Sequence, residues 1–136
     1  MDFVKELKKR GYRITNPREV ICNILETSGH EHFTVDKLHN LAIKEDKNID
    51  LATVYRTLEL LEDIDIVEHM HQAHGSGIYY LKGENDNNHI ICDFCKSIYD
   101  LTKETKDRIN KLLVKDSNFN LINHNFIYSG VCKNCN

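Results

Sequence analysis

The sequence predicts an α+β protein with an N-terminal winged helix-turn-helix domain and a C-terminal β-β-α-β domain, which zinc stabilises and which forms a dimer. Apolar residues repeat at helical spacing as far as Asp63 and at strand spacing beyond it. A polar stretch, Gly-Glu-Asn-Asp-Asn-Asn, occupies residues 83–88, and two Cys-x-x-Cys pairs lie in the last third. We therefore expect a domain at 1–82, a hinge at 83–88 and a dimerisation domain at 89–136.

The N-terminal elements are placed by capping residues and by a change in apolar period. Asn followed by Pro is typical of a helix start, and Gly is common just past a helix end. A hairpin follows the last helix, because two strand-like runs flank a Gly-rich turn. The expected elements are helices at 2–10, from Asn16 to Ser28, after Thr34 and from Asp50 to Asp63, then strands at 66–71 and 78–81.

The C-terminal domain is expected to place strands at 89–91 and 97–101 on either side of the first cysteine pair. A helix at 102–115 with Ile109, Leu112 and Leu113 inward leads to a strand at 119–128 and the second pair. A unit of about fifty residues is marginal alone, so zinc and a dimer partner should supply what its core lacks.

Four cysteines predict a closed zinc site. Two residues between paired cysteines let both sulfurs face one ion, and two such pairs complete a tetrahedral thiolate shell. A site with no open position holds structure and does not catalyse, and the sequence shows no nucleophile–base constellation, so we expect no enzyme. The fifth cysteine, Cys22, is read as a small packed residue. The zinc ligands are Cys92, Cys95, Cys132 and Cys135.

The composition excludes several classes of protein. The 136 residues carry a net charge of −3 and contain no apolar run of the length a membrane span needs. An odd number of cysteines, five, argues against a secreted disulfide framework, and the lack of a signal-peptide core agrees. We therefore expect a cytoplasmic protein with no membrane partner and no small-molecule substrate. The first 18 residues are locally basic, with six Lys or Arg against two acidic residues, which permits nucleic-acid binding.

The fourth helix is the candidate for reading DNA. Its core stripe should be Leu51, Val54, Leu58 and Leu61, leaving another face with small, aromatic and basic residues that suit a major groove. The bland alternative is an ordinary solvated helix face. The expected DNA contacts are Ala52, Thr53, Tyr55 and Arg56 on this helix, with Arg13, Thr15 and Arg18 on phosphates.

Four segments together resemble the ferric uptake regulator (Fur) family of metal-responsive repressors: "LKKRGYRITNPREVI", "DLATVYRTLELLEDIDIV", "HIICDFCKSIYDL" and "NHNFIYSGVCKNC". The resemblance covers nearly the whole chain. It implies a homodimeric repressor that binds palindromic double-stranded DNA operators. It also places the four paired cysteines on the family's structural zinc ligands, and Tyr55 and Arg56 on its base-reading helix.

The resemblance further implies a regulatory divalent metal near the hinge, Fe, Zn, Ni or Mn, with ligands from both domains. His32, His89 and Asp100 match its pattern, whereas Tyr80 stands at the position of a carboxylate and Asn87 at that of a histidine. His69 and His71 alternate on one face of a strand and are expected to join this site, since neutral imidazole binds such metals.

A second site implied by the resemblance has Asp86, Asp107 and His124 as its nearest equivalents. Two alternatives to a metal-controlled repressor stay open. One is a Fur-like regulator that binds DNA without a corepressor metal, and the other is a zinc-ribbon module for protein interactions.

Overall fold

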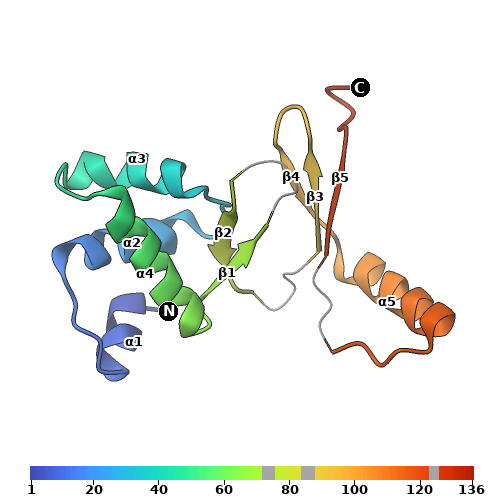
Figure 1. The fold of residues 1–136 in the computed structure, drawn as a ribbon, viewed down its shortest axis with the longest axis horizontal. Coiled ribbons are helices and arrows are strands. Elements are labelled where there is room, and N and C mark those ends of the chain that lie inside the picture. Colours follow the sequence, from blue (N-terminus) through green and yellow to red (C-terminus); the bar gives the residue numbers. More distant parts are fainter. Residues whose placement is uncertain (72–75, 84–87, 123–125) are drawn as a thin grey trace. The chain divides into compact units, whose positions relative to one another are not determined.

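A computed structural model describes residues 1–71, 76–83, 88–122 and 126–136. The chain divides into two compact units, Met1–Lys82 and Gly83–Asn136, and each contains helical structure and a sheet of its own (Figure 1). Helices and strands occur together in both, which confirms the predicted α+β class. No helix in the described ranges is long and apolar enough to cross a membrane.

Unit 1 consists of helices followed by an antiparallel hairpin. The helices begin at side-chain caps: Asp2, Thr34 and Asp50 each accept a hydrogen bond from the backbone N–H three residues on. The second helix differs from the prediction, because Thr15 and not Asn16 is its N-cap. The elements are α1 (Phe3–Lys9), α2 (Asn16–Ser28), α3 (Val35–Glu45), α4 (Leu51–Asp63), β1 (Val67–Met70) and β2 (Ile78–Leu81).

The core of unit 1 lies between the helices and one face of the hairpin. Leu25 from α2, Leu38 from α3 and Leu58 from α4 are buried together with Val67 and Tyr79 from the strands. Cys22 is fully buried in the same cluster, as predicted, and burial raises the pKa of its thiol to about 12. This thiol is therefore a packing group and not a nucleophile.

Unit 2 is a three-stranded sheet with one helix. The strands are β3 (Asn88–Cys92), β4 (Ile98–Asp100) and β5 (Phe126–Gly130), and the helix is α5 (Lys103–Ser117). The strand order is β4-β3-β5, with β4 antiparallel and β5 parallel to β3 (Figure 1). In the parallel register Cys92 lies beside Gly130, so both cysteine pairs follow at the same end of the sheet.

The last strand is shorter than predicted. A strand over 119–128 was expected, but β5 begins at Phe126, and residues 119–122 form no strand. Asn118 adopts the left-handed conformation that ends α5, with φ of 58°. The exposed Phe119 and Ile122 that follow have no strand neighbour in the described ranges to pair with.

Candidate nucleic-acid interface and metal centres

One face of α4 is exposed while the opposite face is packed in the core. Val54, Leu58 and Leu61 are fully buried, whereas the side chain of Tyr55 is 45% exposed. Ala52 and Arg56 are exposed and Thr53 is half-buried, so the four predicted base-contacting residues reach or border solvent. The expectation for Leu51 was wrong: it is 39% exposed, because it is the first residue of the helix and lies beyond the end of the core.

The other predicted DNA contacts cluster around the start of α2. Arg13 is exposed. Its backbone carbonyl oxygen accepts a hydrogen bond of 2.5 Å from the Arg18 guanidinium. Thr15 caps the same helix without a side-chain hydrogen bond, so its hydroxyl remains available as a donor. Two guanidinium groups and a hydroxyl beside a helix N-terminus form a suitable set of phosphate contacts.

The four paired cysteines come together at one end of the unit 2 sheet. Their Sγ atoms all lie within 4.8 Å of one another, and Cys95 Sγ and Cys132 Sγ are 3.8 Å apart. Tetrahedral zinc–sulfur bonds of about 2.3 Å imply a sulfur–sulfur separation of about 3.8 Å. The residues therefore fit a structural zinc ion.

Hydrogen bonds and neighbouring sulfurs shift the pKa values of these thiols in different directions. Backbone N–H groups, first that of Cys132 and then that of Cys95, lower the pKa of the Cys92 thiol to about 6. The Ser97 side chain lowers the pKa of Cys95, whereas the neighbouring Cys132 sulfur raises that of Cys135 to about 12. Four thiolates at this spacing repel one another, so a cation is needed to keep all of them ionised.

His89 and Asp100 form a cross-strand pair in unit 2. They lie opposite each other in the β3–β4 register, and His89 Nδ1 is 2.5 Å from Asp100 Oδ1. A carboxylate on Nδ1 fixes the tautomer whose lone pair is on Nε2, which is a common arrangement for a metal-binding histidine. Asp100 is thus placed to orient His89 as well as to offer an oxygen ligand.

The unit 1 hairpin has two chemically different faces. Phe33 exchanges two backbone hydrogen bonds with Tyr79, at 2.8 and 2.7 Å, and so pairs with β2 in an isolated antiparallel bridge. Because side chains alternate along a strand, His32 shares a face with Tyr80 and Glu68, and His69 shares the other with Tyr79.

This alternation separates two histidines from the predicted regulatory site. His69 and His71 were expected to join His32, but they follow the Tyr79 side of the ribbon while the His32 ring contacts Tyr80. The His69 ring stacks on Tyr79 with centroids 4.2 Å apart and lies 4.2 Å from the His71 ring. A cavity of about 220 Å³ adjoins them, lined by Val35, Asp36, Tyr55, His69, His71, Ser76, Gly77 and Tyr79.

Of the second predicted metal site, only Asp107 is described, and it is exposed on α5. Asp86, Asn87 and His124 lie outside the described residues.

The helix α5 has no buried residue, contrary to the prediction that Leu112 and Leu113 face inward. Their exposed fractions are 66% and 45%, and those of Phe119 and Ile122 after the helix are 71% and 88%. Tyr99 and Tyr128 on β4 and β5 are also exposed. Apolar surface on this scale is typical of an interface between proteins.

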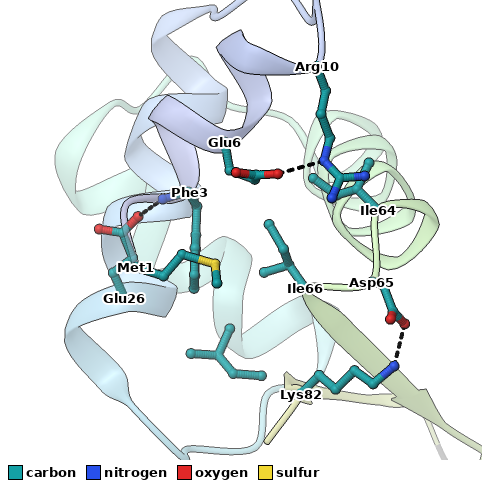
Figure 2. Close-up of a pocket in the computed structure, with 10 residues that line it drawn as sticks. Met1, Phe3, Glu6, Arg10, Glu26, Ile64, Asp65, Ile66 and Lys82 are labelled. Carbon is teal, nitrogen blue, oxygen red and sulfur yellow. Dashed lines mark hydrogen bonds and ion pairs between the residues drawn. The ribbon is translucent and has the colours of Figure 1, made fainter.

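A cavity of about 530 Å³ in unit 1 lies between α1 and the segment that joins α4 to β1. Figure 2 shows ion pairs between Glu6 and Arg10 and between Asp65 and Lys82, around the apolar side chains of Phe3, Ile64 and Ile66. No histidine or cysteine lines this cavity, so its ligand set does not suit a transition metal.

Comparisons with known proteins identify relatives over the whole chain. The sequence model of the Ferric uptake regulator family matches residues 9–129. The ferric uptake regulation protein of Campylobacter upsaliensis is 32% identical, covering 98% of this chain and 86% of that protein. The peroxide-responsive repressor PerR of Staphylococcus saprophyticus is 31% identical, covering 98% and 89%.

A solved structure agrees with the fold. The Helicobacter pylori ferric uptake regulator Fur, described as having three functional metal-binding sites, superposes with a TM-score of 0.81 at 26% identity. The match covers 98% of this chain and 88% of that one. Members of the family are DNA-binding transcriptional regulators and not enzymes. The family model spans most of the chain, whose cysteine cluster is compatible with zinc, and this chain belongs to the ferric uptake regulator family.

Proposed function

We propose that this protein is a homodimeric repressor that binds a palindromic double-stranded DNA operator under the control of a divalent metal. The observation that carries the proposal is the α4 face, where Ala52, Tyr55 and Arg56 are exposed over a fully buried Val54 and Leu58. A helix held this way can enter a major groove without losing its core contacts. The protein acts in the cytoplasm, where thiols stay reduced.

DNA contacts divide into base reading and phosphate anchoring. Arg56 reaches guanine or a phosphate, and Ala52 or Thr53 contacts a thymine methyl group. Arg13, Thr15 and Arg18 anchor the phosphate backbone at the start of α2, supported by the hydrogen bond between Arg18 and the Arg13 carbonyl. Two copies of this arrangement in a dimer would read two half-sites of a palindrome.

Zinc on the four cysteines has a structural role in this proposal. Unit 2 buries few side chains, so the metal supplies folding energy that its small core lacks. The exposed apolar residues of α5 and the strand residues Tyr99 and Tyr128 then form the contact with a second copy.

The regulatory metal is proposed to bind His89 and Asp100 of unit 2 together with His32 of unit 1. The His89–Asp100 pair supports this assignment, because it orients an imidazole and a carboxylate together. A metal that binds residues of both units favours the arrangement that fits DNA, by its greater affinity for that state. Asp86, Asp107 and His124 remain a proposed second site.

A DNA-binding measurement with a matched variant tests the function. Operator sequences are selected from a random DNA pool with the metal-loaded protein, and affinity is measured by fluorescence anisotropy. Arg56→Ala should weaken binding to the selected site by ~1–3 kcal/mol. Lys44→Ala, which removes a positive charge at the far end of α3, should have little effect. Failure to select any sequence, or equal binding by both variants, contradicts the proposal.

A further inference from the structure

A histidine of α3 holds the backbone just before α4 begins. The first backbone hydrogen bond of α4 is accepted by its N-cap, Asp50, so the carbonyl group of Ile49 lies outside the helical ladder. His39 Nε2 on α3 lies 2.9 Å from this carbonyl oxygen. Because a carbonyl oxygen can only accept, the imidazole carries a proton on Nε2 and donates it. The chain is thus tied to α3 at the residue that precedes the cap of α4.

The hydrogen bond between His39 and Ile49 is sheltered from water. Ile49 is 3% exposed, and His39 is half-buried. Water competes little for a hydrogen bond in such surroundings, so the bond holds the backbone more firmly than one on an open surface. Loss of the donor would leave a buried carbonyl oxygen without this partner, which is costly.

A second tie joins the turn before α4 to the start of α2. Asp46, the C-cap of α3, accepts hydrogen bonds from the Asn48 backbone N–H over 3.0 Å and from the Asn16 side-chain amide over 2.9 Å. Asn16 was expected to cap α2, but Thr15 takes that position and the Asn16 amide is directed to Asp46 instead. The contact therefore links the turn to the segment that carries the proposed phosphate contacts.

The two ties fix the base-reading groups relative to the phosphate-contacting groups. Thr53 and Arg56 follow directly after the tied segment, and hydrogen bonds from Thr53, then the charge of Arg56, lower the pKa of the capping Asp50. Reading a base edge requires side chains placed to within about 0.5 Å, whereas attraction to phosphates does not. A small change in the direction of α4 should therefore weaken specific binding more than non-specific binding.

We propose that His39 is a positioning residue for sequence-specific DNA recognition, assisted by the contact between Asp46 and Asn16. The inference rests on the proposed function, because it assumes that α4 reads an operator. It gives a role in recognition to a histidine that belongs to neither of the proposed metal sites.

The test compares binding of the metal-loaded, full-length protein to the selected operator and to a scrambled duplex of equal length and composition. His39→Phe keeps an aromatic ring but has no donor, whereas His39→Gln restores an N–H group at a similar distance from the backbone. We expect His39→Phe to bind the operator roughly 3- to 10-fold more weakly, the range that one hydrogen bond contributes, with unchanged affinity for the scrambled duplex. His39→Gln should regain most of this loss, which a role in apolar packing alone would not produce.

Two further variants separate positioning from direct contact with DNA. Asn16→Ala breaks the tie to Asp46 and should weaken binding to the operator alone. The dependence of its affinity on salt concentration should match that of the wild type, because no phosphate contact is lost. His30→Phe makes the same exchange as His39→Phe at an exposed histidine and should bind as the wild type does.

The outcomes distinguish this inference from the proposed function. If the wild type selects an operator that Arg56→Ala binds weakly, but His39→Phe binds it with full affinity, only this inference fails. Equal losses on both duplexes, or a loss that His39→Gln does not regain, would also overturn it. If the wild type selects no sequence, the proposed function fails and the inference fails with it.

Discussion

At the scale of single residues, the position of His69 depends on the absence of a side chain at Gly77. A Cβ atom built on Gly77 would lie 2.1 Å from His69 Nε2, well inside van der Waals contact. The ring could make room only by moving toward the adjoining cavity, which would disturb its stacked contact with Tyr79, where the two planes are only 8° apart.

Gly77→Ala should therefore destabilise unit 1 by about 1–3 kcal/mol, the usual cost of overpacking. Urea denaturation measures the change in the free energy of unfolding. Gly130→Ala is the matched control, since its Cβ would meet no atom within 4 Å. Equal stability of Gly77→Ala and the wild type would contradict the packing described for the β1–β2 hairpin.

The same histidine makes stability depend on pH. Burial, and then the charge of His71, lower the pKa of His69 below its ordinary value of 6.5. The unfolded chain therefore binds this proton more readily than the folded chain does. The neutral His69 ring therefore contributes to the free energy of unfolding. This contribution is complete above the pKa of the unfolded chain and is lost progressively as the pH falls below 6.5.

His69→Phe keeps an aromatic ring against Tyr79 but removes the titrating group. Between pH 7.5 and pH 5.5 the wild type should lose more unfolding free energy than this variant does. Chemical denaturation of both proteins at each pH gives the comparison. Identical pH dependence would show that His69 is not the responsible group.

At the scale of elements, the sequence predicts most helices because caps and apolar period agree. Thr34 and Asp50 accept the expected hydrogen bonds, and the apolar stripe of α4 is buried from Val54 onward. The prediction of a strand over 119–128 was wrong in its first half, because Phe119 and Ile122 are residue types that are common in strands. Their apolar side chains are instead exposed in the single chain.

The β1–β2 hairpin shows why contacts between strands escape sequence reasoning. Tyr80 and Glu68 are twelve positions apart, and only the hairpin register places them opposite each other. A shift of one residue would exchange the two faces of β1, sending Glu68 to the side of Tyr79 and His69 to the side of Tyr80. The strand period alone therefore could not assign His69 and His71 to a face that lacks His32.

The apolar surface of α5 gives a prediction for assembly. Leu112→Glu places a charge on a side chain that is 66% exposed in the single chain, in a surface proposed to be covered in the dimer. We expect a shift from dimer to monomer in size-exclusion chromatography with light scattering, because an unpaired charge is costly at an interface. Lys111→Glu, at the next and also exposed position, should remain dimeric. A dimeric Leu112→Glu protein would place the interface elsewhere.

At the scale of the whole molecule, the two units differ in what stabilises them. Unit 1 has an extensive core of buried apolar residues, whereas in unit 2 the buried apolar residues are Ile91 and Cys92 of β3 among those described. Family membership and the zinc cluster could be inferred from the sequence, because short segments and the two Cys-x-x-Cys motifs indicate them. The cross-strand contacts of His89 with Asp100 and of Tyr80 with Glu68 could not, because they join residues that are distant in the chain.

Removal of zinc should therefore unfold only one unit. A strong chelator is expected to broaden or shift the NMR signals of residues 88–136 while those of unit 1 remain dispersed, because bound zinc contributes folding energy to the small unit alone. Readdition of zinc should restore the spectrum. Retention of all unit 2 signals after verified zinc loss would contradict a structural role.

In the proposed function, a second metal controls DNA binding. The most direct test measures the affinity of the zinc-replete protein for its selected operator with and without one further equivalent of Mn²⁺ or Fe²⁺. The metal should tighten binding by a coupling free energy of about 1–3 kcal/mol, roughly 5- to 150-fold. His89→Ala should abolish the effect. Equal affinity with and without the metal would show a regulator that binds DNA without a corepressor.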